Sequence, residues 1–423
     1  MATYKPLEVL FHQSTRNAQS IAQNELEKRL NNPATLTFPY LVGANPLFVV
    51  LHRGLYELSE EVWRTENEVQ RLWTMLPKVA QNHFLGTLLV EEIHSTNEIE
   101  NVQSSRQEVA EALDAATRND NSIPPKRFHE MVSTFKLLIQ KDDSQDSEFP
   151  QTLEGLRALY DQLLGAEITK DNQPDGELFR AGPVYITDGS NSAVHKGVYG
   201  EDEIKSRLSV MLDASTDGSR PLLVSAFVAH FMVEHTHPFY DGNGRFGRFL
   251  LALELRQILS APTALSLSAQ VRKQKNKYYK AFAHVENPLN RGEATFFVND
   301  MLAMLLAAQN DLEEQLRVRW RSLRSLEERI DTLKKTKKDL GDYQIATLFM
   351  LGQVLLFGPR NGVTLDEVAD FLERSKQTVR PVLKSLTDKG LIEAVNKRPL
   401  VFTLTGKGKE FLNLEEPQLS SAA

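Results

Sequence analysis

The sequence contains no cysteine among its 423 residues, which excludes disulfide bonds and metal sites built on thiolates. It also lacks an apolar run of ~18 residues, the length that a helix needs to cross a bilayer. No basic start followed by an apolar core marks a signal peptide. The formal net charge is −7, so the chain as a whole is not expected to bind nucleic acid unspecifically. These absences predict a cytoplasmic protein without membrane contact.

The remaining composition is that of an ordinary globular protein, with 41% hydrophobic and 25% charged residues. The length allows two or three domains with a sizeable core. Apolar residues recur mostly at helical spacing, for example along 51–76, 84–102, 107–118, 152–164 and 221–235. The sequence therefore predicts a mainly α fold.

One segment of twelve residues, 237–248, combines a titratable base, a carboxylate, a glycine-rich turn and two arginines: His-Pro-Phe-Tyr-Asp-Gly-Asn-Gly-Arg-Phe-Gly-Arg. Gly242, Asn243 and Gly244 can adopt the tight or left-handed backbone angles that direct successive N–H groups at one anion. Helical spacing begins at Arg245, so the turn is expected at a helix N-terminus, where unpaired N–H donors favour negative charge.

The polar side chains of this segment suit work on a polyphosphate. Arg245 and Arg248 are three residues apart, hence on one helix face, where both guanidinium groups could hold phosphate oxygens. Asp241 offers the hard oxygen that Mg²⁺ prefers. His237 titrates near neutral pH and is the candidate general base.

Three alternative interpretations of the segment are weaker. Residues 242–247 also fit G-x-G-x-x-G, but a dinucleotide site needs a preceding strand and an acid about 20 residues later. Residues 221–235 instead have the pattern of an apolar helix, and 260–272 contain no acid. A metal pair of His235 and His237 lacks an evident third ligand. A purely structural role would not call for an acid, a base and two arginines together.

Residues 237–248 resemble the signature of the Fic family, His-Pro-Phe-x-(Asp/Glu)-Gly-Asn-Gly-Arg-x-x-Arg, without departure. The resemblance implies an all-helical core and transfer of AMP from ATP, with Mg²⁺, to a Ser, Thr or Tyr hydroxyl of a target protein or of the chain itself. It implies that His237 deprotonates the hydroxyl, that Asp241 binds Mg²⁺, and that Arg248 holds the terminal phosphate. The turn from Gly242 to Arg245 would form the anion hole.

A second pattern, Thr96-x-x-x-Glu100-Asn101, occurs once, upstream of the motif. It resembles the inhibitory-helix pattern of many Fic proteins, (Ser/Thr)-x-x-x-Glu-(Gly/Asn). In that interpretation Glu100 pairs with Arg248, so that ATP enters with its phosphates misplaced for in-line attack. The alternative is that Glu100 is a solvated carboxylate at a helix end.

Two further stretches resemble parts of the family's substrate sites. Val184, Tyr185 and Ile186 form the first strand of an expected hairpin that turns at Asp188-Gly189 and returns over 193–198. This resembles the Fic flap, which pairs with the target's backbone. Many relatives carry Pro-Pro after the flap, whereas residues 196–199 here are Lys-Gly-Val-Tyr, and an ordinary surface hairpin is the alternative.

Tyr278 and Tyr279 resemble the family's tyrosine pair, of which one lines the adenine pocket. Aromatic faces suit purine stacking. Packing in the core is an equally good role for one of the two.

The C-terminal region has the pattern of a winged helix-turn-helix, with helices over 343–356, 364–373 and 379–388 and a hairpin after Gly390. Residues 374–409 contain nine basic and two acidic residues, an excess of seven positive charges in an acidic protein. Lys376, Arg380 and Lys384 are the candidate DNA contacts. Winged helices also dock proteins, so the partner stays open.

The expected domains are an N-terminal helical region (1–84), a Fic catalytic domain (85–310) with the inhibitory helix around 85–102, a helical linker (311–340), a winged helix-turn-helix domain (341–412) and a tail (413–423). The near-heptad leucines of the 294–338 helix could pair two chains as a homodimer. Alternatives to AMP addition are AMP removal or transfer of another nucleotide by the same site. A DNA-binding regulator with a nucleotide-sensing Fic domain is the alternative of a different class.

Overall fold

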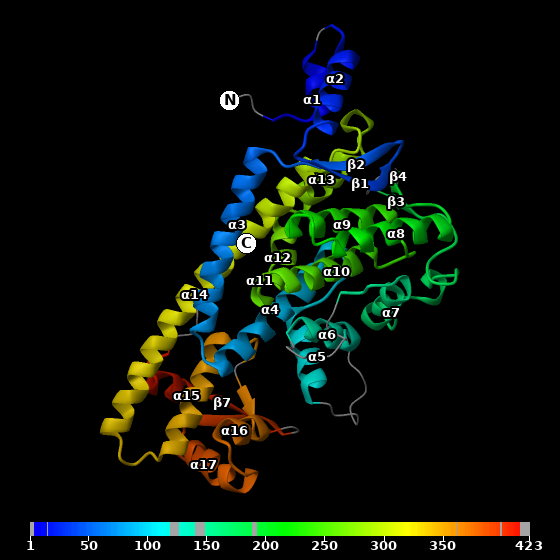
Figure 1. Cartoon of the computed structure of the whole chain (residues 1–423). Helices are drawn as coiled ribbons and strands as arrows, with labels where there is room; N and C mark the ends of the chain where they lie inside the picture. The colour runs from blue at the N-terminus through cyan, green and yellow to red at the C-terminus, as the bar shows by residue number, and fades with distance from the viewer. Residues whose placement is uncertain are drawn as a thin grey trace. The chain divides into compact units, whose positions relative to one another are not determined.

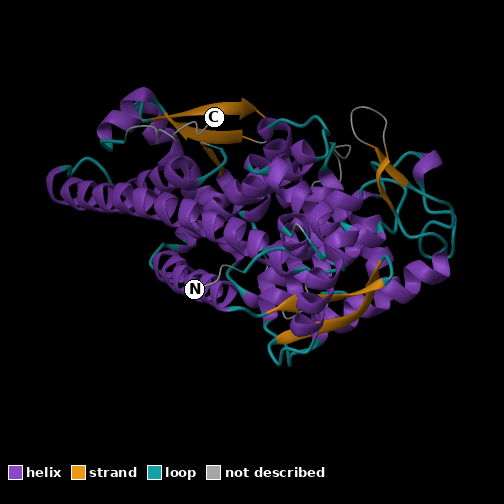
Figure 2. Cartoon of the chain, turned by 90° about the horizontal axis from the view of Figure 1, so that it is seen from above, coloured by secondary structure: helices purple, strands orange, loops and turns teal. Residues whose placement is uncertain are grey.

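The computed structural model describes residues 4–14, 16–118, 127–139, 149–187, 193–360, 362–397 and 400–414. The chain is mainly α, as predicted, and its few strands form small separate sheets (Figures 1 and 2). It divides into two compact units, 1–67 with 91–310 and 68–90 with 311–423. Within the described residues, no helix has both the length and the apolar character needed to span a membrane.

The first unit contains the motif and most of the helices. Three helices, α3 (Arg53–Thr74), α4 (Lys78–Ile99) and α14 (Thr295–Thr336), contribute residues to both units. The other helices of the first unit are α1 (Leu7–Gln13), α2 (Ala18–Leu30), α5 (Arg106–Arg118), α6 (His129–Phe135), α7 (Leu153–Leu164), α8 (Glu201–Thr216), α9 (Leu222–Thr236), α10 (Asn243–Ile258), α11 (Ala261–Ala264), α12 (Leu267–Lys273) and α13 (Lys275–Glu286), with short 3₁₀ turns at Lys136–Leu138, Lys170–Asn172 and Pro288–Asn290.

Helix α9 is the centre of this unit. It is apolar on nearly every side and buried over almost its whole length, as a helix enclosed by others must be. Helices α8 and α10 lie against it on either side (Figure 1). The motif therefore begins where a rigid, fully packed helix ends, which fixes the position of His237 at its C-cap.

Two hairpins lie outside the helical core of this unit. Strands β1 (Thr35–Val42) and β2 (Asn45–Val50) pair antiparallel, with an irregular register between Phe38 and Leu41. Pro39 lies at that irregularity, where a missing N–H does least harm to a ladder. This hairpin was not predicted, because Pro33, Pro39 and Pro46 favour an extended or turning chain over a paired strand.

The second hairpin is the one that the sequence predicted after Val184. Strand β3 (Tyr185–Thr187) pairs antiparallel with β4 (Ala193–Lys196). Val184 lies just before the strand, and its carbonyl accepts the Gly197 N–H at 3.2 Å. The expected turn at Asp188-Gly189 lies outside the described residues.

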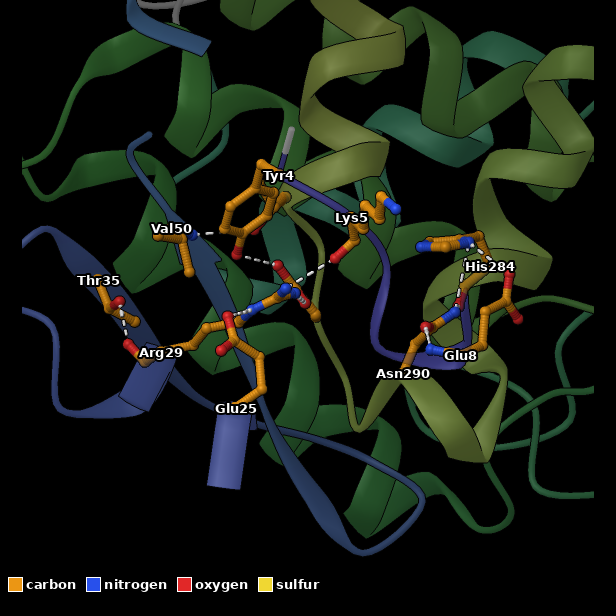
Figure 3. A network of polar contacts seen from close by, with 11 residues as sticks. Tyr4, Lys5, Glu8, Glu25, Arg29, Thr35, Val50, His284 and Asn290 are labelled. Atoms are coloured by element: carbon orange, nitrogen blue, oxygen red, sulfur yellow. Dashed lines mark hydrogen bonds and ion pairs between the residues drawn. The ribbon is translucent and has the colours of Figure 1, made fainter. Parts of the chain in front are cut away.

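The N-terminal segment is held by a polar network (Figure 3). The Arg29 guanidinium is 4% exposed and donates from Nη1 to Glu293 Oε2 at 2.6 Å and from Nη2 to the Lys5 carbonyl at 2.7 Å. The Tyr4 hydroxyl donates to the other Glu293 oxygen at 2.5 Å, and the Glu8 N–H donates to Asn290 Oδ1 at 3.0 Å. Residues from both ends of the unit's sequence thus share one buried ion pair.

The second unit contains the C-terminal elements. They are α15 (Asp342–Phe357), β5 (Gly362–Thr364), α16 (Leu365–Leu372), α17 (Lys376–Asp388), β6 (Ile392–Lys397), β7 (Leu400–Leu404) and α18 (Gly406–Phe411). The strands form one antiparallel sheet in the order β5-β7-β6. Thr364 and Ser375 cap α16 and α17, since their hydroxyls accept from the N–H groups of Glu367 and Thr378. Strand β5 and helix α18 were not predicted.

Candidate active site

The segment from His237 to Gly242 links the end of α9 to the start of α10 in a tight turn. His237 has left-handed backbone angles (φ 53°, ψ 63°), and so has Gly242 at the N-cap of α10 (φ 78°, ψ 5°). A Cβ at Gly242 would lie 2.6 Å from the Leu164 side chain, so glycine is required there. Asn243 is buried, and its amide group exchanges two hydrogen bonds with the Phe239 backbone at 2.8 and 2.9 Å. Its side chain therefore braces the turn.

The start of α10 has the properties of an anion site. The first backbone hydrogen bond of the helix runs from the Phe246 N–H to the Gly242 carbonyl at 2.9 Å. The N–H groups of Asn243, Gly244 and Arg245 precede it and have no carbonyl four residues back within the helix. They point outward from the positive end of the helix dipole, as phosphate-binding turns require.

Arg248 lies one turn into α10 and is held by residues from the end of α4. Its Nη2 is 2.8 Å from Glu100 Oε1, and its Nε donates to the Thr96 hydroxyl at 2.8 Å. The Thr96 carbonyl also accepts from Nη2 at 3.1 Å. Burial alone would lower the pKa of the Arg248 guanidinium, but the Glu100 carboxylate and neighbouring groups outweigh it and raise the pKa above its usual value. A Cβ at Gly244 would lie 2.1 Å from Glu100 Oε1, so the pair depends on glycine there.

Asn101, the last residue of the upstream pattern, follows Glu100 in left-handed conformation with φ 57°. Its side-chain oxygen accepts from Lys275 Nζ at 3.3 Å. The end of α4 is therefore tied to α13 as well as to Arg248.

Arg245 has a different partner from Arg248. It is 5% exposed, and its Nη1 is 2.8 Å from Glu167 Oε2, in the segment that follows α7. The sequence predicted that both arginines share one phosphate-binding face. In the structure each arginine has its own carboxylate, Glu167 for Arg245 and Glu100 for Arg248, from two segments far apart in the sequence.

His237 presents one nitrogen as a base. Its Nδ1 lies 3.3 Å from the Glu234 carbonyl oxygen, which can only accept, and the tautomer that fits this contact has the proton on Nδ1 and the basic lone pair on Nε2. One carboxyl oxygen of Glu234 is buried against Gly247, and burial raises the pKa of this carboxyl group although Arg248 opposes the shift. The sequence did not single out Glu234.

Asp241 is exposed, and its Oδ1 accepts the Gly242 N–H at 2.6 Å. Among the described residues, no group of three or more His, Cys, Asp or Glu side chains could hold a metal ion by itself. A single exposed carboxylate fits Mg²⁺ that arrives with a nucleotide, because Mg²⁺ is commonly bound by one or two carboxylates together with substrate phosphates and water.

The two tyrosines of α13 differ in exposure. Tyr278 is 2% exposed, and its hydroxyl is 2.8 Å from His230 Nε2 inside the core. Tyr279 is 43% exposed, and the Lys275 ammonium lies 6.0 Å from its ring centroid. The exposed ring of Tyr279 is the one that a purine can reach.

The remaining candidate residues lie outside the turn. Tyr185 on β3 is 54% exposed, whereas the Ile186 side chain is not among those described. In the second unit, Lys376, Arg380 and Lys384 are exposed at intervals of four residues along α17. The buried residues of the same helix are Val379, Leu383 and Leu386.

Sequence patterns did not single out Arg180, which the structure places directly against the motif. Its side chain is 0% exposed, and its Nε donates to the His237 carbonyl at 2.8 Å. Tyr240, the variable position of the motif, donates its hydroxyl to Asp175 Oδ1 and accepts the Gly182 N–H, at 2.9 and 2.8 Å. No pattern in the sequence marks the Arg180 contact, because its acceptor is a backbone carbonyl, which every residue has.

Comparison with known proteins finds a family model that matches part of the first unit. Residues 150–255 match the model of the Fic/DOC family, and this range contains the whole segment 237–248. The chain is similar to a solved Fic family protein from Desulfovibrio desulfuricans G20, with 19% identity, coverage of 85% of this chain and 98% of that one, and a TM-score of 0.49.

Two more solved structures are similar to the chain with lower TM-scores. A Fic domain containing signaling protein from Bacteroides thetaiotaomicron VPI-5482 has 14% identity, coverage of 61% and 97%, and a TM-score of 0.43. Fic-1 (residues 134–508) from C. elegans has 14% identity, coverage of 74% and 81%, and a TM-score of 0.44.

Proposed function

We propose, on the premise that residues 150–255 belong to the Fic/DOC family, that this chain transfers AMP from ATP to a hydroxyl group of a target protein or of itself. The observation that carries the proposal is the joint placement of one basic histidine nitrogen, a helix N-terminus and a buried arginine within a single turn and helix start. The same placement supports transfer of a nucleotide in general, and AMP is the usual group in the family.

In the proposed reaction the target oxygen attacks the α-phosphorus of ATP, and the bond from that phosphorus to the bridging oxygen breaks. Pyrophosphate leaves, and His237 Nε2 takes the hydroxyl proton. The N–H groups at the start of α10 hold phosphate oxygens, so positioning and charge neutralisation supply most of the catalysis. Asp241 would hold Mg²⁺, which neutralises phosphate charge when bound.

We further propose that Glu100 inhibits this reaction. Arg248 is the natural partner of the terminal phosphate, but its Nη2 is engaged by Glu100 at 2.8 Å and its Nε by Thr96. A triphosphate that entered beside this pair would find the arginine occupied and its α-phosphorus out of line with His237.

The test compares three proteins incubated with labelled ATP and Mg²⁺: the native chain, Glu100→Gly, and Glu100→Gly with His237→Ala. Label is expected on protein with Glu100→Gly and not with the double variant, which should still bind ATP because the cradle is intact. Label at equal rates with and without His237 would refute its role as base. A control with ATP labelled only at the terminal phosphate separates AMP transfer from phosphate transfer.

The same site could remove AMP from a modified protein or use another nucleotide. Pre-labelled Glu100→Gly protein, freed of nucleotide and incubated with the native chain, tests removal by the release of label. Competition of labelled ATP with unlabelled CTP, GTP and UTP tests the choice of base.

We propose DNA as the partner of the second unit, because α17 exposes Lys376, Arg380 and Lys384 as a row at intervals of four residues. A basic row of this kind suits a phosphate backbone. A chain that binds duplex DNA yet never labels protein would instead be a nucleotide-sensing regulator. A chain that binds no DNA at any salt concentration would favour protein docking by this unit.

A homodimer is the proposal for the oligomeric state, from the leucine spacing of α14. Light scattering of the full chain over a range of concentrations tests it. A mass of 47.8 kDa, that of one chain, at all concentrations would refute it.

A further inference from the structure

Arg180 is the largest of the fully buried side chains and lies at the root of the β3–β4 hairpin. Its guanidinium makes four hydrogen bonds, and every acceptor is a backbone carbonyl. Nε donates to His237 O at 2.8 Å, Nη1 to Gly182 O at 2.6 Å, and Nη2 to Val198 O at 2.6 Å and Thr236 O at 3.3 Å.

The backbone around Arg180 makes further hydrogen bonds between the same segments. The Arg180 N–H donates to the Pro238 carbonyl at 3.2 Å, and the Val198 N–H donates to the Thr236 carbonyl at 3.1 Å. Arg180 therefore engages three successive carbonyls, those of residues 236, 237 and 238. It also engages carbonyls on both sides of the hairpin, Gly182 before β3 and Val198 after β4.

The contacts of the Arg180 guanidinium indicate that it holds the hairpin and the His237 backbone in place. A buried cation is costly unless it is fully hydrogen-bonded, and a guanidinium is suited to several acceptors because it offers five N–H groups in a fixed plane. Burial lowers the pKa of the Arg180 guanidinium, although Tyr240 and Asp175 oppose the shift. A Cβ at Gly197 would lie 2.6 Å from Arg180 Nη2 and 3.1 Å from the His237 Cβ, so hairpin, arginine and histidine are in close contact.

The backbone of His237 explains why such a group is needed. A non-glycine residue in the left-handed region is strained, and it keeps that conformation only where its surroundings hold it. The helix end holds the His237 N–H, which donates to the Val233 carbonyl at 3.0 Å. Arg180 holds the carbonyl on the other side of the residue.

We infer that Arg180 is a positioning residue for the proposed transfer: it locks the left-handed backbone of His237 to both roots of the hairpin, so that the base keeps a fixed position beside the hairpin. The inference rests on the proposed function. Arg180 contacts none of the groups that hold phosphate, so its effect falls on the reaction step and not on nucleotide affinity.

The experiment uses the full-length Glu100→Gly chain as background and adds Arg180→Lys. Lysine keeps the charge but cannot satisfy four carbonyls in one plane. The matched control is Arg256→Lys, since Arg256 is a half-buried arginine of α10 whose Nε donates to the Leu138 carbonyl at 3.1 Å, away from the motif. Arg180→Met provides the variant without charge.

The first readout is self-modification with labelled ATP. With Arg180→Lys, the maximal rate should fall about tenfold to hundredfold, while KM for ATP stays within about twofold. With Arg256→Lys, the maximal rate and the KM for ATP should both match those of the Glu100→Gly background. An unchanged maximal rate with Arg180→Lys would overturn the positioning role. So would a variant that loses both ATP affinity and unfolding temperature, because its lower rate would then come from a damaged fold.

The second readout needs no turnover. In chains labelled with ¹⁵N-histidine, the ring signal of His237 is identified by its loss in a His237→Ala variant. It should shift or split with Arg180→Lys and stay in place with Arg256→Lys. If the background itself transfers no AMP, the proposed function fails, and this ring signal alone decides on Arg180: an unmoved signal refutes the inference.

Discussion

Replacing Glu100 with glutamine separates the charge of the inhibitory contact from its shape. Glutamine has nearly the same size and keeps one oxygen that can accept from Arg248, but it removes the negative charge. Arg248 is 4% exposed in its side chain and Glu100 is 31% exposed, so the pair lies at the border of the interior. Two unit charges ~4 Å apart attract by about 4 kcal/mol at a near-surface dielectric and by about 1 kcal/mol in water.

Desolvation and the partial exposure of Glu100 reduce that attraction. A net value of about 1.5–3 kcal/mol is typical of a hydrogen bond to a charged group, which corresponds to about a tenfold to hundredfold gain in rate when the bond is lost. Glu100→Gln should reach the lower part of that range. Glu100→Gly should reach the upper part, because it also empties the space beside Gly244, and Glu100→Asp should give less than Glu100→Gly.

The assay is incorporation of labelled AMP into protein, together with titration of ATP binding. The maximal rate should rise more than the ATP affinity, because the carboxylate misplaces ATP rather than excluding it. Glu108→Gln is the matched control, since Glu108 is an exposed acid that caps α5 through Ser105 and does not contact Arg248.

A double-mutant cycle with Arg248→Ala completes the test. In that background Glu100→Gln should have no effect, because the partner is already gone. Equal rates for the native chain, Glu100→Gln and Glu100→Gly, all correctly folded and supplied with Mg²⁺, would return Glu100 to an ordinary helix-end carboxylate.

Three further outcomes are expected. Arg272→Ala should raise basal AMP incorporation by up to about fivefold. Arg272 Nη1 pairs with Glu98 Oε2 at 2.6 Å near the end of α4, and exposed ion pairs of this kind contribute about 0.2–1 kcal/mol. Raising the salt concentration should stimulate AMP incorporation by the native chain more than by this variant. Glu254 is 6% exposed, and burial raises its pKa to about 8. The stability that comes from its neutral form is therefore complete below the pKa of the unfolded chain, ~4.3, and is lost as the pH rises towards 8. Glu254→Gln should therefore increase the unfolding temperature relative to the native chain at pH above 8 and make no difference near pH 4, and a constant difference across this range would contradict the shift. Alanine at both Arg380 and Lys384 should weaken binding of the full chain to duplex DNA and flatten its salt slope by about two units, one for each phosphate contact.

The sequence predicted those parts of the site whose geometry is local. The segment 237–248 has its chemistry, its glycines and its helix start within twelve residues, so backbone rules suffice to place the anion site. The pairing of Glu100 with Arg248 is a contact across 148 positions, and it could be predicted only because both ends belong to recognised patterns.

Contacts that lack such a pattern were not predicted. Arg180 looks in the sequence like part of an extended stretch, because its acceptors are backbone carbonyls and any residue has one. The partner of Arg245 is Glu167, which looks in the sequence like any surface acid after a helix. The β1–β2 hairpin was missed for another reason: its prolines argue against a strand, and only the irregular pairing at Pro39 makes room for one.

The ion pair between Arg29 and Glu293 sets a condition on biosynthesis. The two residues are 264 positions apart, so at ~5–20 residues per second a ribosome needs roughly 13 to 53 seconds to make the second after the first. During that interval the N-terminal helices have no buried acid to neutralise Arg29 and no Asn290 to receive Glu8. Until then the N-terminal segment cannot make its native contacts. It can pack into the first unit only when α13 and the start of α14 have left the ribosome. A chain cut short before Glu293 would leave this segment permanently unsatisfied and exposed to proteases.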